Sequence, residues 1–244
     1  MTVRIGIAGW TYEPWRGVFY PPGLRQADEL AYASRRLTTI EINATFYSAQ
    51  KPQSFARWAA TAPDGFRFSL KASRFCTYRK DLGEAGEAID RFLGQGLIEL
   101  GDRLGPILWQ LMASKRFDPH EIESFLDLLP DKRDGAPLRH VIEAPHESFR
   151  DPGFADACRR RGVAVCRSDA TLTAKDAEPA ADFAYVRLLQ AQDAVETGYT
   201  ADALDALSDQ LRALAAEGRA VYAYVVNQGK LRAPQAATEL IARL

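Results

Sequence analysis

Eight strand-like segments recur along this 244-residue chain, each separated from the next by a longer stretch. They are residues 3–8, 38–43, 66–71, 107–111, 140–143, 163–166, 183–188 and 221–227. Helical spacing or a helix-start signal occupies most of the stretches between them. Such alternation of strand and helix is typical of an α/β fold in which eight parallel strands close into a TIM-type (β/α)8 barrel.

The stretches between the strands refine this expectation. Helix-start signals stand at Asp118-Pro119, Asp151-Pro152 and Thr200, and residues 234–244 predict a last helix that covers the first strand. Residues 168–182 lack an amphipathic pattern, so the sixth crossover helix should be degenerate. An open doubly wound sheet is the alternative, but no GxGxxG motif follows the first strand. We find no linker and expect a single domain over residues 1–244.

Composition and charge limit the kinds of binding partner and cellular setting that we expect for this chain. The 31 basic and 32 acidic residues nearly cancel, so affinity for nucleic acid would have to come from a local patch and is disfavoured. Cys76, Cys158 and Cys166 show no CxxC spacing and indicate free thiols in a reducing cytoplasm. The N-terminus enters a strand without a signal region, and no apolar run is long enough for a membrane helix.

Strand alternation predicts which side chains face the barrel axis. In the third strand Phe66, Phe68 and Leu70 should face the helices, which turns Arg67, Ser69 and Lys71 inward. The same reasoning turns inward Glu41, Asn43, Gln110, Glu143, Arg187 and Asn227. Barrel interiors are mostly apolar, so this polar set indicates either an internal ionic network or a site at the carboxyl ends of the strands. Pairing of the two glutamates with Arg67, Lys71 and Arg187 would satisfy such a network.

Candidate roles follow from chemistry and position. We expect Glu143, Lys71 and His146 to be catalytic, with Glu143 and His146 as acid and base and Lys71 as an anion-holding or Schiff-base lysine. Expected ligand-binding residues are Asn43, Arg74, Gln110, Asp169, Arg187, Asn227, Trp10 and Tyr47. Asp169 is equally typical of a loop-capping aspartate.

No cofactor or metal is expected. The three histidines lack metal-ligand spacing, His140 should be a packed histidine and His120 a surface one. A carboxylate-held Mg²⁺ at Glu41, Glu143 and Asp169 stays open as an alternative.

Seven ordered motifs resemble the domain-of-unknown-function family 72, the YecE-like proteins. They occupy residues 6–21, 41–47, 65–75, 104–111, 138–149, 181–188 and 223–234. The resemblance implies a TIM-type barrel and brings no established activity.

The chain departs from the family pattern at several strand ends. Pro145 stands where the family usually has arginine, Leu189 where it often has histidine, and Val226 where it often has asparagine. Met112-Ala113 replaces the usual prolines. The resemblance therefore implies that a basic side chain, an imidazole and an amide are missing from the barrel mouth.

Together these patterns predict an enzyme of hydrolase or lyase type that acts on a small anionic, phosphate- or carboxylate-bearing ligand at the C-terminal barrel mouth. The alternatives are a nucleotide or single-stranded nucleic-acid binding barrel, which would use aromatic loops with Arg79 and Lys80, and a degenerate non-catalytic member. The sequence leaves the oligomeric state open.

Overall fold

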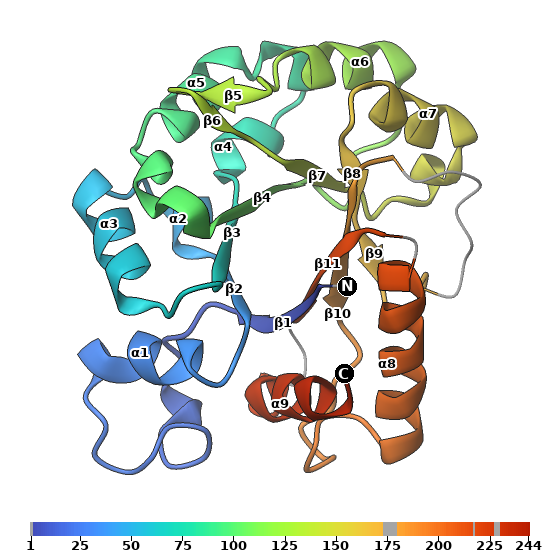
Figure 1. The fold of residues 1–244 in the computed structure, drawn as a ribbon. Helices are drawn as coiled ribbons and strands as arrows, with labels where there is room; N and C mark the ends of the chain where they lie inside the picture. The colour runs from blue at the N-terminus through green and yellow to red at the C-terminus, as the bar shows by residue number, and fades with distance from the viewer. Residues whose placement is uncertain (1, 173–179, 217, 227–229) are drawn as a thin grey trace.

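A parallel sheet closes around a central axis in the computed structural model, which describes residues 2–172, 180–216, 218–226 and 230–244 (Figure 1). Its strands lie in the order β8-β7-β4-β3-β2-β1-β11-β10-β9. They are β1 (Val3–Ala8), β2 (Thr39–Ile42), β3 (Arg67–Lys71), β4 (Leu104–Gln110), β7 (His140–Glu143), β8 (Ala164–Val165), β9 (Arg167–Ser168), β10 (Phe183–Leu188) and β11 (Ala220–Val225). The predicted α/β barrel is confirmed.

The sixth barrel position is filled by two short strands. β8 pairs with β7 and β9 pairs with β10, both in parallel. Cys166 lies between them, and its amide donates to the carbonyl oxygen of Ile142 at 2.8 Å. The break lets β8 pair with one neighbouring strand and β9 with the other. The predicted segment 163–166 contains β8 but ends one residue before β9.

Helices surround the sheet (Figure 1). The longer ones are α1 (Glu29–Ser34), α3 (Pro52–Thr61), α5 (Gly86–Leu93), α6 (Pro119–Asp127), α7 (Pro152–Arg160), α8 (Ala201–Ala216) and α9 (Ala233–Arg243). Single turns form α2 (Ala44–Tyr47) and α4 (Arg74–Thr77), and 3-10 turns form η1 (Glu13–Trp15), η2 (Gln26–Asp28), η3 (Leu82–Glu84), η4 (Leu97–Arg103) and η5 (Glu147–Arg150). α9 packs against β1, as expected.

The predicted helix starts are confirmed by their caps. The Asp118 carboxylate accepts from the amide of Glu121 at 3.0 Å, and the Asp151 carboxylate accepts from that of Gly153 at 2.8 Å. The Thr200 hydroxyl accepts from the amide of Ala203 at 3.3 Å. Each bond satisfies a helix N-terminal N–H group that has no partner within the helix.

Two crossovers between barrel strands differ from a simple helical connection. Residues 173–179 of the sixth crossover lie outside the described residues, and the described residues on either side of them form no helix. A small antiparallel hairpin, β5 (Lys132–Arg133) with β6 (Ala136–Pro137), precedes β7 and was missed by the sequence analysis. Its turn residues Asp134 and Gly135 have φ of 49° and 82°, the left-handed conformation that an Asp-Gly hairpin turn requires.

The core has two layers, one on each side of the sheet. Phe68 and Leu70 belong to the outer layer between strands and helices, whereas the Ser69 hydroxyl lies inside the barrel, 2.6 Å from the hydroxyl of Tyr224. The inner layer is made by Leu108, Val141, Ala164, Phe183, Tyr185, Tyr222, Tyr224 and Val226. Strand alternation is therefore as predicted, and large side chains fill the barrel below its carboxyl end.

None of the helices within the described ranges is long and apolar enough to cross a membrane.

A cation-lined cavity at the barrel mouth

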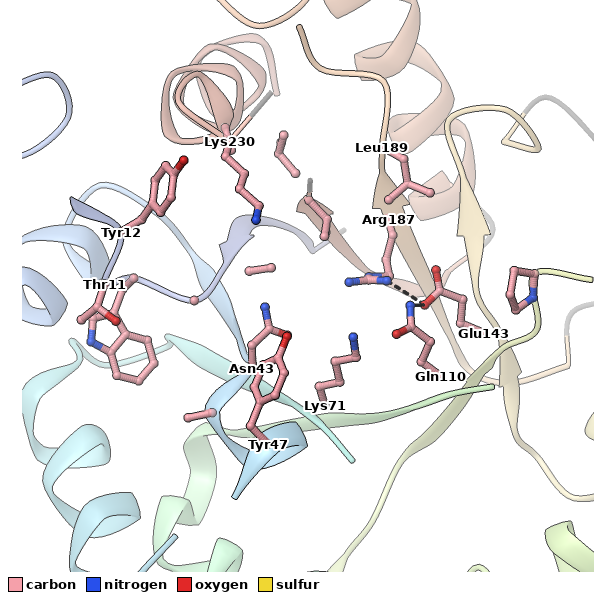
Figure 2. A pocket seen from close by; sticks show the side chains of 18 of the residues that line it. Thr11, Tyr12, Asn43, Tyr47, Lys71, Gln110, Glu143, Arg187, Leu189 and Lys230 are labelled. Atoms are coloured by element: carbon pink, nitrogen blue, oxygen red, sulfur yellow. Dashed lines mark hydrogen bonds and ion pairs between the residues drawn. The ribbon is translucent and has the colours of Figure 1, made fainter. Parts of the chain in front are cut away.

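A cavity of about 730 Å³ lies at the carboxyl ends of the strands (Figure 2). Seven of the residues predicted for the site line it, and they come from six strands or the loops that follow them. They are Trp10, Asn43, Tyr47, Lys71, Gln110, Glu143 and Arg187. The structure thus brings together residues up to 177 positions apart in sequence.

Arg187, in β10, is the centre of a buried ionic network. Its Nη1 lies 2.7 Å from Oε2 of Glu143, and its Nη2 lies 3.2 Å from Oε1 of Glu41. Glu41 is fully buried, and its second oxygen accepts from the hydroxyl of Tyr185 at 2.7 Å. Burial alone would lower the pKa of Arg187, but the two carboxylates outweigh it and raise the pKa, so the guanidinium stays charged.

Arg67 takes no part in this network, contrary to the expected pairing. Its guanidinium donates to the backbone carbonyl of Phe66 at 3.1 Å, at the opposite end of β3. The sequence analysis expected the two glutamates to pair with three cations, Arg67, Lys71 and Arg187. The structure places both glutamates on Arg187 and leaves Lys71 outside the ion pairs.

Glu143 is held in one orientation. It lies opposite Gln110 in the register of β4 and β7, and Gln110 Nε2 donates to the same Oε2 atom that Arg187 binds, at 2.7 Å. Within the described part of the chain no group hydrogen-bonds to the other oxygen, Oε1. The two donors on Oε2 therefore fix the position of the whole Glu143 carboxylate, which lines the cavity, including its second oxygen, Oε1.

Lys71 ends β3 with an ammonium group that points into the open space (Figure 2). Its backbone carbonyl accepts from the hydroxyl of Thr45 at 2.7 Å, and its Nζ lies 4.2 Å from the centre of the Phe46 ring. Among the described residues no carboxylate lies within 4.0 Å of Nζ. Burial and the neighbouring charge of Arg187 lower the pKa of Lys71, against the opposing effect of Glu41 and Glu143.

A second cation, which the sequence analysis missed, lies at the rim. The ammonium of Lys230 lies 6.0 Å from the centre of the Tyr12 ring, and Figure 2 shows it pointing toward the same space as Lys71. The indole N–H of Trp15 donates to the backbone carbonyl of Lys230 and fixes this loop against the one after β1. Trp15 and Lys230 both lie within family motifs named above, residues 6–21 and 223–234, and this was the signal in the sequence that could have identified Lys230 as a site residue.

Aromatic side chains form one wall of the cavity. Trp10 packs edge-to-face on Trp58 with ring centres 5.3 Å apart, which fixes the indole. Tyr47 is 65% exposed and Tyr78 is 46% exposed, and both pack edge-to-face on Phe46. The wall presents flat, partly exposed rings to the cavity, with Lys71 Nζ close to Phe46.

Comparison with known proteins agrees with the barrel and with the motifs. The profile of the protein family of unknown function DUF72 matches residues 4–244. The chain belongs to the DUF72 family. The UPF0759 protein YecE of Escherichia coli K12 is 27% identical over 164 residues, which are 66% of this chain and about half (55%) of YecE.

Solved structures show the same fold. A DUF72 protein of Thermotoga maritima superposes with a TM-score of 0.78 at 23% identity, covering 99% of this chain and 98% of that one. D-psicose 3-epimerase of Clostridium cellulolyticum H10, solved with D-tagatose, gives a TM-score of 0.56 at 13% identity over 100% of this chain and 98% of its own. At these identities the likeness establishes the barrel alone.

The positions at which this DUF72 chain departs from the family pattern cluster in the cavity wall. Pro145, Leu189, Val226 and Ala113 all line it. At Pro145, Leu189 and Val226 an apolar wall stands where the resemblance implied polar groups, and Ala113 stands where it implied a proline. The described cations of this cavity are Lys71, Arg187 and Lys230.

Three predicted site residues of the DUF72 chain lie outside the cavity lining. The Nδ1 atom of His146 caps η5 by accepting from the amide of Ser148 at 3.1 Å. Arg74 is exposed at the start of α4, and its guanidinium lies 5.4 Å from the centre of the ring of the next residue, Phe75. Oδ2 of Asp169 accepts from the amides of Leu189 and Gln190 and from the hydroxyl of Tyr199, at 2.7 to 2.9 Å.

Asp169 therefore joins three loop segments. This is the role of a loop-capping aspartate, the alternative to ligand binding that the sequence left open. Asn227 lies outside the described residues. Within the described ranges no three His, Cys, Asp or Glu side chains form a group that could hold a metal ion, so the Glu41, Glu143 and Asp169 set does not assemble.

Proposed function

We propose that this DUF72 barrel is an enzyme of hydrolase or lyase type that transfers protons on a small anionic ligand bound in the cavity at its mouth. One observation carries the proposal: Lys71 presents to the cavity an ammonium that has no carboxylate partner among the described residues, and the oriented carboxylate of Glu143 lines the same cavity. A cation without a counter-ion favours an incoming anion, and a fixed carboxylate beside it is a candidate general base.

The pairing of the charged groups in the cavity supports this proposal. Arg187 is neutralised by Glu41 and Glu143, so the attraction for a ligand anion comes mainly from Lys71 and Lys230. Arg187 remains a candidate hydrogen-bond donor to the ligand. Asn43 and Gln110 supply amide groups at the same ends of the strands, and Trp10 and Tyr47 supply ring faces.

The fold neighbours support the size and class of the ligand. Two D-psicose 3-epimerase structures with a similar barrel were solved with single sugars, D-fructose and D-tagatose. A cavity of about 730 Å³ lies within the usual range of small-molecule sites. We infer a polyhydroxylated or carbonyl-bearing acid or phosphate rather than a polymer.

Inorganic phosphate tests the anion pocket without knowledge of the substrate. A ligand at about a hundredfold excess over its Kd stabilises the folded state by roughly 2.7 kcal/mol. At about 2–4 °C per kcal/mol for a domain of this size, we expect phosphate to raise Tm by about 5–10 °C against chloride of equal ionic strength.

Three variants locate the effect. Lys71→Met and Lys230→Met should each reduce the phosphate-induced rise in Tm, whereas Lys132→Met, in the exposed hairpin before β7, should leave it unchanged. Equal responses of the parent and all three variants would place the anion elsewhere and contradict the proposal.

A single-stranded nucleic-acid site is the second candidate. Phe75 is 65% exposed and lines a neighbouring hollow together with Tyr78, Arg79 and Arg91. Glu84 and Glu87 line the same hollow and oppose a polyanion. We expect single-stranded DNA to bind weakly and in a strongly salt-dependent way, and sub-micromolar binding at physiological salt, measured by fluorescence anisotropy, would reverse the ranking.

A further inference from the structure

We propose that Lys71 is a nucleophile that forms an imine with the carbonyl carbon of an anionic aldehyde or ketone in the barrel cavity. This inference rests on the proposed function, because the same cavity must hold the anionic group of the ligand. It goes further by assigning a covalent step and by naming the substrate class as carbonyl-bearing acids and phosphates.

The position of the amine is the first argument. Lys71 stands at the last residue of β3, and its main chain is fixed from α2 by the hydrogen bond from Thr45 to its carbonyl, at 2.7 Å. Its side chain is half-buried but ends in the cavity (Figure 2). A nucleophile needs a held stem and an accessible head, and Lys71 has both.

The second argument is what surrounds Nζ. A lysine that serves only as a structural cation normally has a carboxylate partner when it is buried. Here the two nearby carboxylates, Glu41 and Glu143, both bind Arg187. Nζ instead has the Phe46 ring 4.2 Å below it and the Arg187 guanidinium as a like charge.

The protonation state follows from those neighbours. Only a neutral amine attacks a carbonyl, so a nucleophilic lysine must lose its proton more easily than an exposed one. Burial, followed by the charge of Arg187, lowers the pKa of Lys71, while Glu41 and Glu143 act in the opposite direction. An exposed lysine such as Lys132 lacks this environment.

Glu143 provides the proton transfers that the step needs. The Nζ lone pair forms the C–N bond, the carbonyl π bond breaks, and the oxygen takes up a proton to give a carbinolamine. Loss of the nitrogen proton and of the protonated hydroxyl then releases one water and leaves the C=N bond. The carboxylate of Glu143, which lines the same cavity and is oriented by Gln110 and Arg187, is the group that we assign to accept and return these protons.

The anionic end of the ligand is assigned to Lys230. Its ammonium points into the same space from the rim, on a loop tied down by Trp15. A ligand bound by its carbonyl carbon to Lys71 and by its charge to Lys230 would lie across the cavity, along the wall that Trp10 and Tyr47 line. The inferred substrate therefore carries its charge at the end remote from the reacting carbon.

Reductive trapping tests the inference. The protein is incubated with glycolaldehyde phosphate and sodium cyanoborohydride, whose hydride reduces an imine to a stable secondary amine, and the modified lysines are located by peptide mass spectrometry. We expect Lys71 to be modified at least about tenfold faster than the exposed Lys51 and Lys132, since binding places the carbonyl beside the amine. Lys71→Arg keeps the positive charge but removes the primary amine, so labelling at position 71 should vanish while the phosphate-induced rise in Tm persists.

The outcomes separate the two proposals. Selective labelling of Lys71 together with a phosphate response supports both. A phosphate response with equal labelling of Lys71, Lys51 and Lys132 overturns the imine and leaves the anion pocket standing. Absence of both effects overturns both, and selective labelling without any phosphate response overturns the anionic substrate class assigned here.

Discussion

Two buried polar clusters lie on opposite faces of the same sheet, and they are satisfied in different ways. Behind the sheet, Trp109 Nε1 donates to Nδ1 of His140 at 3.1 Å, and Nε2 of His140 lies 2.9 Å from the carbonyl oxygen of Pro130. Each polar atom of the two rings has a protein partner. Inside the barrel, Glu41, Arg187 and Glu143 form an ionic chain, but Lys71 Nζ and Glu143 Oε1, on two residues that line the cavity, have no such partners among the described residues.

The difference teaches how to recognise a site among buried polar residues. Burial of a polar group is costly unless a partner compensates it, so a fully satisfied cluster such as Trp109 with His140 is explained by packing alone. A cluster whose remaining donors and acceptors all point to one cavity is explained by a ligand. The following predictions test whether the two clusters behave as differently as this comparison requires.

Loss of the central cation of the barrel cluster should have the largest effect. In Arg187→Met, the fully buried Glu41 keeps the hydroxyl of Tyr185 as its one side-chain partner among the described residues. Breaking a buried pair from one side costs about 3–5 kcal/mol, so we expect the free energy of unfolding, measured by urea denaturation, to fall by that amount.

A surface ion pair provides the matched control. Arg160 lies 2.7 Å from Glu123, and both side chains are more than half exposed. Arg160→Met should cost less than about 1 kcal/mol. A cost below about 1 kcal/mol for Arg187→Met as well would show that the barrel network is not a buried ionic cluster in solution.

The cluster behind the sheet should reveal itself through pH. Since Nδ1 of His140 accepts from Trp109, the ring proton must lie on Nε2, and a second proton would face the Trp109 N–H. Burial lowers the pKa of His140, although the Pro130 carbonyl and Asp131 oppose this. Below about pH 6.5 the unfolded chain therefore binds more protons than the folded one.

The free energy of unfolding should therefore decrease as the pH is lowered. The expected decrease is roughly 1.4 kcal/mol per pH unit between the unfolded and folded pKa values of His140. Other groups also titrate in this range, so the measurement is the difference between the parent and His140→Gln. His120→Gln, at an exposed position in α6, is the control and should follow the parent. Parallel pH profiles for the parent and both variants would contradict the assigned tautomer and burial.

Local patterns predicted the frame of the molecule well. Alternation in residues 66–71 correctly separated Phe68 and Leu70 from Ser69 and Lys71, because the two-residue period of a strand fixes which face a side chain takes. The same rule placed Glu143 and Arg187 in one cavity. In the two-part sixth strand, the predicted segment 163–166 covers β8 and misses β9 by one residue.

Loop positions were beyond such reasoning. His146 and Arg74 lie within three residues of strand ends, yet both turn away from the cavity, because loop conformation rather than strand period directs them. Lys230 lines the cavity, and its carbonyl accepts from Trp15, 215 residues earlier, a contact that no local pattern predicts. Asp134-Gly135 was a local signal that was overlooked.

Lys71→Met should have the smallest effect on stability, and that is the sharpest contrast with Arg187. Removing Lys71 breaks no ion pair within the described residues and forfeits a contact with Phe46 worth about 0.5–1 kcal/mol. The lowered pKa of Lys71 means that its charged form is held unfavourably in the folded protein, so a neutral methionine offsets that loss. We expect a change of less than about 1 kcal/mol in the free energy of unfolding at neutral pH.

The sign also depends on pH. Between the lowered pKa of folded Lys71 and its ordinary value of 10.5, the unfolded chain binds more protons, so the parent should gain stability relative to Lys71→Met as pH rises toward 10.5. Urea denaturation of both proteins at neutral pH and near pH 10 measures this difference, and Lys132→Met, at an exposed position, should show none. If Lys71→Met instead cost as much as Arg187→Met, Lys71 would be a structural member of the ionic chain, and the unpaired ammonium that distinguishes the barrel cluster would not exist in solution.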